Sequence, residues 1–256
     1  MPGYTPELIE ISKNQTRCSE CPIRHQTLFQ GVKKEDLNLV QSYRTGQYRL
    51  KARQEIFLEA QNSQYLFSIY HGWCAIYKSL GNGKKQIIKI ALPGDLIGFQ
   101  SNIEAPLNYS AISLTDMVLC AFPRNEFTGL LNRNAFVLKR LMELNAREMN
   151  LCQNHLMAIG KNIAIEKISL FCAELFLRFH NIYQLPLTNR IFFPLTQVEI
   201  GDATGLTCVH VNRTLKTLSD MNLMDISART LTVPDIDKLC KLGQFDAKSI
   251  HTYTLY

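Results

Sequence analysis

Two short helical patterns joined by a glycine constrain the fold of this 256-residue chain more than any other feature. Thr196 followed by Glu199 is a capping box, in which each side chain satisfies a free backbone amide at the helix start. Gly205 then supplies a turn, and Thr207 is expected to cap a second helix over about residues 208–219. Two such helices predict a helix-turn-helix, whose second helix enters the major groove of DNA. An ordinary helical hairpin with a solvated polar face fits the same pattern.

The second of these helices carries side chains suited to reading DNA. Its core side is expected at Val211, Leu215 and Leu218. On the opposite side, Arg213 can make a bidentate contact with guanine, and Asn212 can pair with adenine. Lys216 is suited to a phosphate contact, and the start of the preceding helix can also anchor the DNA backbone.

Alternating residues after the second helix predict a β-hairpin. Residues 222–233 read as two short strands that would form a wing beside the helix pair, with Arg229 near its tip. The predicted DNA contacts, taken together, are Thr196, Gln197, Thr207, Val209, His210, Asn212, Arg213, Lys216 and Arg229.

A run of helix formers over residues 124–160 predicts a long helix with two stripes of mostly apolar side chains. One stripe advances by three and four residues, as in a heptad seam, and consists of Leu131, Ala135, Leu138, Met142, Asn145, Met149, Cys152, Leu156 and Ile159. The other stripe consists of Val137, Leu141, Leu144 and Leu151. Because the second stripe suffices to pack the helix on its own domain, the first predicts a symmetric homodimer, with Asn145 fixing the register. The alternative is a single helix that packs only on its own domain.

Strand patterns dominate the chain between about residues 46 and 122. Short alternating stretches such as residues 65–70 and 74–78 are separated by turn residues. The sequence Gly81-Asn82-Gly83 lies between two of them, which is typical of a hairpin because positive φ angles are favourable there. This region therefore predicts a small antiparallel barrel or roll.

Composition limits the classes of protein that remain. No apolar run reaches the roughly 18 residues of a membrane span, and the first residues lack a signal-peptide pattern, so we expect a cytoplasmic protein without a membrane partner. Among eight cysteines, only the pair Cys18 and Cys21 has the spacing of metal ligands. An enzyme is not expected, because the sequence contains no nucleophile elbow, phosphate-binding glycine loop or His-Glu-x-x-His motif.

The net charge of +6 is a weak guide to nucleic acid. Lysine and arginine number 28 against 22 acidic residues, but residues 161–256 hold ten basic and nine acidic residues. Most of the surplus therefore lies in the first 160 residues. The hypothesis of DNA binding depends on the capped helix pair and its local side chains.

These features together resemble the Crp/Fnr family of bacterial transcription regulators, from about residue 15 to 243. Residues 205–215, with the sequence Gly-Leu-Thr-Cys-Val-His-Val-Asn-Arg-Thr-Leu, are similar to the family's recognition helix. Residues 92–99, with the sequence Leu-Pro-Gly-Asp-Leu-Ile-Gly-Phe, are similar to its β-roll turn. The resemblance implies an α+β fold: an antiparallel β-roll of the double-stranded β-helix or jelly-roll type, a long dimerisation helix and a winged helix-turn-helix.

The resemblance also implies an organisation and a set of partners. We expect an N-terminal arm over residues 1–30, a sensory β-roll domain over 31–123, the dimerisation helix over 124–160 and the DNA-binding domain over 161–256. The expected partners are a second copy of the chain, double-stranded DNA with a palindromic operator, and RNA polymerase. Val209 and Asn212 stand where the family's oxygen sensors carry Glu and Ser, so the operator is expected to differ from theirs.

The family's cyclic-AMP-binding members hold the phosphate with Gly-Glu followed by Arg-Ser or Arg-Thr. Here the matching residues are Gly94-Asp95 and Tyr109-Ser110, so Tyr109 takes the place of the arginine. A buried phosphate without its cation is not compensated for desolvation, and cyclic AMP is therefore not expected as the effector. Haem is not expected either, because its candidate ligands, His71, Cys74, Met142 and Met149, are explained as core or surface residues.

The family's oxygen sensors bind a [4Fe–4S] cluster with four thiolates. Cys18, Cys21 and Cys120 resemble three of them, Thr27 occupies the spacing of the missing thiolate, and His25 lies near enough in sequence to supply a nitrogen. One hypothesis is therefore an iron–sulfur cluster, or another metal such as zinc, at these residues. The alternative is an arm that retains the cysteine pair without a metal.

Overall fold

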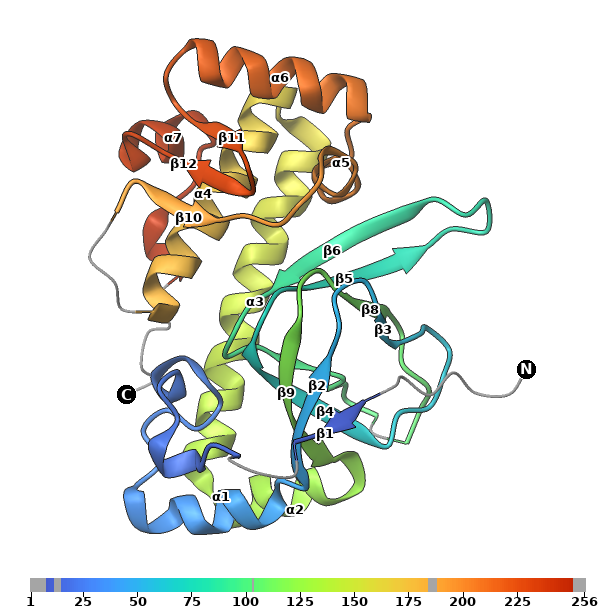
Figure 1. The fold of residues 1–256 in the computed structure, drawn as a ribbon. Coiled ribbons are helices and arrows are strands. Elements are labelled where there is room, and N and C mark those ends of the chain that lie inside the picture. Colours follow the sequence, from blue (N-terminus) through green and yellow to red (C-terminus); the bar gives the residue numbers. More distant parts are fainter. Residues whose placement is uncertain (1–7, 12–14, 103, 184–187, 251–256) are drawn as a thin grey trace. The chain divides into compact units, whose positions relative to one another are not determined.

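A computed structural model describes residues 8–11, 15–102, 104–183 and 188–250 (Figure 1). It has two compact units, residues Met1–Lys78 with Lys89–Met142, and residues Ser79–Ile88 with Glu143–Tyr256. The first is built largely from antiparallel strands and the second largely from helices. The expected α+β fold is confirmed.

The strands of the N-terminal half form two antiparallel sheets. One has the order β1-β2-β9-β4-β7, and the other has the order β3-β8-β5-β6. The strands are β1 (Ile9–Glu10), β2 (Gly46–Leu50), β3 (Glu55–Phe57), β4 (Tyr65–His71), β5 (Cys74–Ser79), β6 (Lys85–Ala91), β7 (Leu96–Ile97), β8 (Ser110–Ser113) and β9 (Met117–Pro123). Side chains of Phe67, Ile69 and Leu119 point inward from β4 and β9 and are almost completely buried. These three side chains belong to one buried hydrophobic cluster, which holds the strands of the roll together.

The predicted hairpin at Gly81-Asn82-Gly83 connects β5 to β6. Leu80 donates its backbone N–H to the carbonyl of Lys84 at 2.8 Å, and Gly83 has a φ of 80°. Before the roll, the arm forms short 3-10 helices at Cys18–Glu20 and Arg24–Gln26. A third follows the arm at Lys34–Asp36, and α1 spans Leu37–Tyr43.

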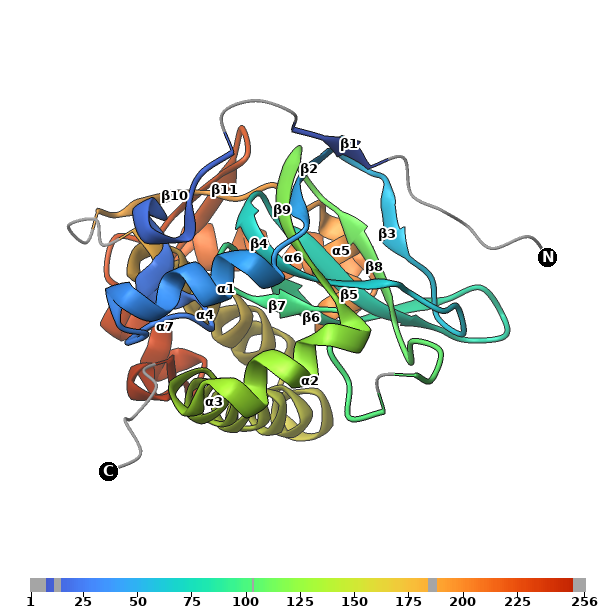
Figure 2. The ribbon, with the colours of Figure 1, turned by 90° about the horizontal axis from the view of Figure 1, so that it is seen from below.

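The helical run after β9 consists of two helices, α2 (Arg124–Arg133) and α3 (Ala135–Lys161) (Figure 2). The expectation of one continuous helix over residues 124–160 is wrong at Asn134, which has the extended angles φ −137° and ψ 100°. The side chain of Asn134 accepts the backbone N–H of Val137 at 3.1 Å and so caps α3. Leu131, assigned to the heptad seam, therefore lies on α2 and not on the long helix.

The C-terminal half packs three helices and a small sheet around α4. Its elements are α4 (Ala164–Tyr183), β10 (Arg190–Phe192), α5 (Gln197–Thr204), α6 (Cys208–Asp220), β11 (Asp225–Ser227), β12 (Thr230–Thr232), α7 (Ile236–Leu242) and a 3-10 helix (Ala247–Ile250). The predicted wing hairpin is present as β11 and β12. Strand β10 adds to it in the order β10-β12-β11. Strand β10 is not among the strands expected from the sequence.

A buried charged network joins α3 to α4 within this half. Glu174 on α4 is 4% exposed and lies between two basic side chains. Arg178, one turn later on α4, donates to its carboxylate at 3.0 Å, and the Nε2 atom of His155 on α3 pairs with the other carboxylate oxygen. Burial by itself would raise the pKa of Glu174, but His155 and Arg178 outweigh it and lower that pKa to about 2.

Candidate nucleic-acid interface and cysteine pocket

The first helix of the predicted pair begins with the expected capping box. The backbone N–H of Glu199 donates to Thr196 Oγ1 at 3.3 Å, and the backbone N–H of Thr196 donates to Glu199 Oε2 at 2.7 Å. The helix ends at Gly205, whose φ of 70° lies in the left-handed region that glycine adopts without strain. The turn packs so tightly that a Cβ on Gly201 would lie 2.5 Å from the carbonyl oxygen of Leu206.

The second helix, α6, presents one face to the core and the other to solvent. Thr207 caps it by accepting the backbone N–H of His210 at 3.3 Å. Its buried residues are Val211, Thr214 and Leu218, whereas Leu215, which was expected in the core, is half-buried. Thr214 is buried because it lies three residues after Val211 and four before Leu218, on the same side of the helix.

The solvent side of α6 holds the side chains predicted to contact DNA. These are exposed and comprise Thr207, Val209, His210, Asn212, Arg213 and Lys216. Within the part of the chain that the structure describes, neither Arg213 nor Lys216 forms an ion pair, so both cations are available to an anionic partner. Arg229 is exposed at the turn between β11 and β12, where Ala228 and Arg229 both have positive φ angles, as in a type I′ turn.

Thr196 and Gln197 stand at the start of α5, where the sequence reading placed backbone anchors. Thr196 is exposed, while Gln197 is half-buried and turned toward α6. Gln197 Oε1 accepts a hydrogen bond from Asn212 Nδ2 at 3.2 Å and from Cys208 Sγ at 3.9 Å. Cys208, an exposed residue at the first position of α6, was not among the predicted contacts. It lies four residues before Asn212, on the same face of the helix.

The two stripes of α3 have opposite environments within the single chain. Val137, Leu141, Leu144 and Leu151 are buried. Of the seam residues on this helix, Leu138, Met142, Met149 and Leu156 are between 42% and 71% exposed, and Ala135, Asn145, Cys152 and Ile159 are exposed too. Exposure of a row of large apolar side chains to water is unfavourable. Burial of the row against a partner surface would recover that free energy.

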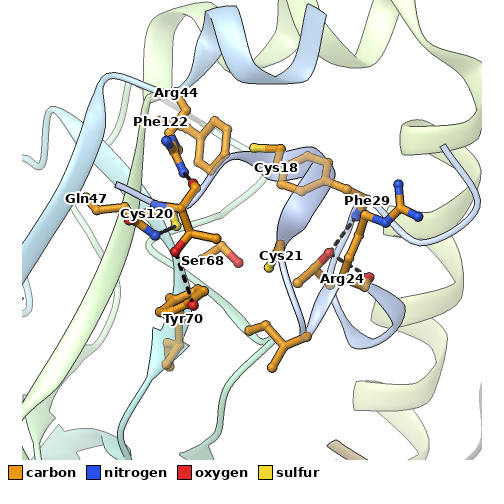
Figure 3. A pocket seen from close by; sticks show the side chains of 14 residues that line it. Cys18, Cys21, Arg24, Phe29, Arg44, Gln47, Ser68, Tyr70, Cys120 and Phe122 are labelled. Atoms are coloured by element: carbon orange, nitrogen blue, oxygen red, sulfur yellow. Dashed lines mark hydrogen bonds between the residues drawn. The ribbon is translucent and has the colours of Figure 1, made fainter. Parts of the chain in front are cut away.

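Three cysteines line one pocket of the N-terminal unit. Cys18 and Cys21 come from the arm and Cys120 comes from β9 (Figure 3). Arg44 and Gln47 border the same pocket, and Gln47 Nε2 donates to Cys120 Sγ at 3.4 Å. The structure thus brings Cys120 next to the arm pair Cys18 and Cys21, about 100 residues earlier in the sequence, while His25, the fourth predicted ligand, is not among the residues that line the pocket.

Comparison with known proteins identifies both halves. Residues 47–134 match the model of the cyclic nucleotide-binding domain, and residues 172–242 match that of the Crp-like helix-turn-helix domain. The chain belongs to the Crp/Fnr family. Like other Crp/Fnr proteins, it is a DNA-binding transcription regulator and not an enzyme. Within the described residues, no helix combines the length and the apolar character that a membrane crossing requires.

The relatives of this Crp/Fnr chain support the assignment along most of its length. The nitrogen fixation regulation protein FixK of Bradyrhizobium diazoefficiens is 26% identical, over 83% of this chain and 88% of the relative. The transcriptional activator protein FnrL of Cereibacter sphaeroides is 25% identical, over 91% of this chain and 94% of the relative. The solved structure of FixK2 from Bradyrhizobium japonicum has the same fold, with a TM-score of 0.68 at 24% identity over 78% of this chain and 96% of that one.

Asp95 and Tyr109, which the resemblance places at the phosphate site of cyclic-AMP-binding members, are bonded to other protein groups. The hydroxyl oxygen of Tyr109 accepts the backbone N–H of Gly98 at 2.7 Å, and its ring packs edge-on against Phe57. Asp95, the counterpart of the family's glutamate, forms a largely buried ion pair with Lys89 at 3.4 Å. The arginine that would neutralise a phosphate is replaced by Tyr109, and Lys89 already neutralises Asp95.

The cysteine pocket does not fit a [4Fe–4S] cluster. Its cavity volume is about 20 Å³, enough for about one ordered water. Burial raises the pKa of Cys18 to about 11 and also raises the pKa values of Cys21 and Cys120, so the thiols are held in the neutral form. Among the described residues, no three His, Cys, Asp or Glu side chains are grouped closely enough to hold a metal ion. The described residues that line the pocket include no fourth cysteine.

Proposed function

We propose that this regulator acts as a homodimer on a palindromic operator, with one α6 helix in the major groove of each half-site. The observation that supports this proposal most strongly is that α6 is amphipathic. Its buried side packs on the core, and its exposed side carries two cations that are unpaired among the described residues, Arg213 and Lys216, and the amide of Asn212. Two such helices related by a twofold axis would lie about one helical turn of DNA apart.

The side chains predicted to contact DNA have different roles in this proposal. Arg213 makes a bidentate contact with guanine, Asn212 pairs with adenine, and Val209 packs against a thymine methyl group. Lys216, His210 and Thr207 contact phosphates, as do Thr196 on α5 and Arg229 on the wing, and these contacts set the register of the protein on the duplex.

The exposed stripe of α3 supports the dimer. Heptad spacing matches a left-handed pairing of two copies of the helix, in which Met142 and Met149 fill the seam and Asn145 sets its register. A signal received by the β-roll would change the packing of the paired helices and thereby the separation of the two recognition helices. We further propose that the DNA-bound dimer contacts RNA polymerase. The proposed location of the dimer is the cytoplasm.

Selection of bound DNA from a random pool, with and without oxygen, tests the proposal. We expect an enriched inverted repeat whose half-site centres are about 10 base pairs apart. Sedimentation of the free protein should give the mass of a dimer. A pool that stays random, or an enriched site without twofold symmetry, would contradict the proposal.

The alternative expected from the sequence, a metal-dependent redox sensor at Cys18, Cys21 and Cys120, is disfavoured, because among the described residues no three such side chains are grouped closely enough to hold a metal ion. The observation in its favour is that the arm and β9 bring three thiols to one pocket, close enough for Cys120 to raise the pKa of both arm cysteines.

Metal analysis and absorption spectra of protein purified without oxygen test this alternative. A stoichiometric metal that is lost from Cys120→Ser but kept in Cys152→Ser, whose exposed cysteine lies on α3, would support it. Metal-free protein with unchanged oxygen response in the Cys18→Ser variant would leave the arm cysteines without a sensory role.

A further inference from the structure

The amide of Gln197 connects the two helices of the DNA-binding motif. Gln197 is the first residue of α5, yet its Oε1 atom accepts a hydrogen bond from Asn212 Nδ2 at 3.2 Å on α6. The same oxygen accepts a longer contact from Cys208 Sγ at 3.9 Å. Cys208 and Asn212 are one helical turn apart, so Gln197 lies against the exposed face that would approach base edges.

This hydrogen bond fixes which way the Asn212 amide is oriented. An asparagine side chain has one acceptor oxygen and two N–H donors, and its two orientations exchange the oxygen with the nitrogen. Gln197 Oε1 is held toward α6 by a second donor, the Cys208 thiol at 3.9 Å, so a reversed Asn212 amide would place its oxygen against Oε1 and the two acceptors would repel. Gln197 therefore favours the orientation in which one N–H of Asn212 is already used.

The groups that remain on Asn212 match one purine and not the other. Its free oxygen and second N–H complement the N6 amino group and the N7 atom of adenine. Guanine presents two acceptors, N7 and O6, in the same place. To satisfy both, Asn212 would have to direct two N–H groups at the base and give up its bond to Gln197.

We propose that Gln197 is a positioning residue that makes Asn212 select adenine over guanine. The inference rests on the proposed function, in which α6 lies in the major groove. It differs from a phosphate-anchoring role for Gln197, because an anchor strengthens binding to every sequence equally whereas a positioning residue changes the base preference at one pair.

Competition binding to the selected operator and to its single-base variants tests the proposal. The base pair read by residue 212 is defined first, as the pair at which Asn212→Ala loses preference. At that pair we expect the wild type to prefer adenine over guanine about 10-fold to 100-fold, in line with one bidentate contact. Gln197→Ala should reduce this preference at least about 5-fold and leave the other pairs unchanged, and the double variant should be no worse than Asn212→Ala alone.

Two further variants separate positioning from anchoring and from misfolding. Gln197→Glu keeps an acceptor for Asn212, so it should keep the adenine preference even though its negative charge weakens binding to all sequences. Gln197→Leu keeps the size but removes the acceptor and should behave as Gln197→Ala does. Circular dichroism should be unchanged in all three, since Thr196 and Glu199 still cap α5.

The outcomes distinguish failure of the positioning role of Gln197 from failure of the proposed DNA-binding function. Equal weakening of binding to adenine and guanine sites by Gln197→Ala would overturn the positioning role while leaving DNA recognition intact. An unchanged preference in Gln197→Ala would do the same. If the wild type itself enriches no sequence, the proposed function fails first. Substitution of 7-deaza-adenine at the defined pair should reproduce the loss caused by Asn212→Ala, because it removes the N7 acceptor.

Discussion

Glu174 is the carboxylate whose removal should destabilise this protein most clearly through electrostatics. The change Glu174→Gln keeps the shape of the side chain and removes its charge. It leaves Arg178, itself 5% exposed, without the anion that compensates its burial. Removing one partner of a buried ion pair typically costs about 3–5 kcal/mol, since the remaining charge is still desolvated.

The pKa of Glu174 gives an independent value for this loss of stability. The ordinary value is 4.5 and the folded value is about 2. At about 1.4 kcal/mol per pKa unit, this difference corresponds to about 3 kcal/mol of stability. That contribution is present above pH 4.5 and is lost as the pH falls through about 2. We therefore expect Glu174→Gln to lower the free energy of unfolding by about 3 kcal/mol at pH 6.

His155 makes this loss depend on pH. Burial lowers its pKa, but the Glu174 carboxylate more than offsets that effect, and the net pKa lies above the ordinary 6.5. A raised histidine pKa contributes stability below pH 6.5 that disappears as the pH rises through the folded value. The difference between wild type and Glu174→Gln should therefore be smaller at pH 8 than at pH 6.

Urea unfolding followed by circular dichroism at both pH values measures these differences, at one fixed protein concentration because the chain is proposed to dimerise. Glu126→Gln, which changes an exposed carboxylate on α2, is the matched control and should alter stability by less than about 0.5 kcal/mol. A loss below about 1 kcal/mol for Glu174→Gln, or an equal loss at pH 6 and pH 8, would refute the reasoning.

Three further substitutions test the rest of the structure. Gly201→Ala places a Cβ 2.5 Å from the carbonyl of Leu206 and should lower stability by about 1–3 kcal/mol, measured by thermal unfolding, whereas an unchanged melting temperature would mean that the turn adjusts freely. Met142→Glu combined with Met149→Glu puts like charges into the exposed stripe and should give monomers by sedimentation, and a persistent dimer would show that the seam lies elsewhere. Arg213→Ala should weaken binding to the operator by about 1–3 kcal/mol and relax one base preference, whereas equal losses on random DNA would contradict direct readout.

The DNA-binding motif was predictable from sequence because its determinants are local. Thr196 and Glu199 are three residues apart and bond to each other's backbone, and Gly205 adopts the left-handed conformation that its missing Cβ permits. Thr207 caps α6 for the same short-range reason. Such interactions are complete within one turn of chain, so the helix boundaries follow from residue type and spacing.

The break between α2 and α3 at Asn134 was also encoded locally, but it was not predicted. Asn134 is a good helix cap, and its side chain accepts the N–H of Val137. Apolar spacing continued across this position, and that spacing predicted a single helix. In the folded chain, the side-chain hydrogen bond of Asn134 starts a new helix there and offsets the loss of helical continuity.

By itself, then, the sequence determined the capped helix pair, the two stripes of α3 and the polar face of α6, since each depends on periodicity or on neighbouring residues. Only the tertiary structure decided which distant groups meet. Gln197 reaches Asn212 across the turn, Glu174 meets His155 across two helices, and Cys120 joins the arm cysteines from another strand. Spacing along the chain carries no information on such encounters, because they depend on how the elements pack. The net charge of +6 illustrates the same limit, since a global sum does not locate the cations on the face that would meet DNA.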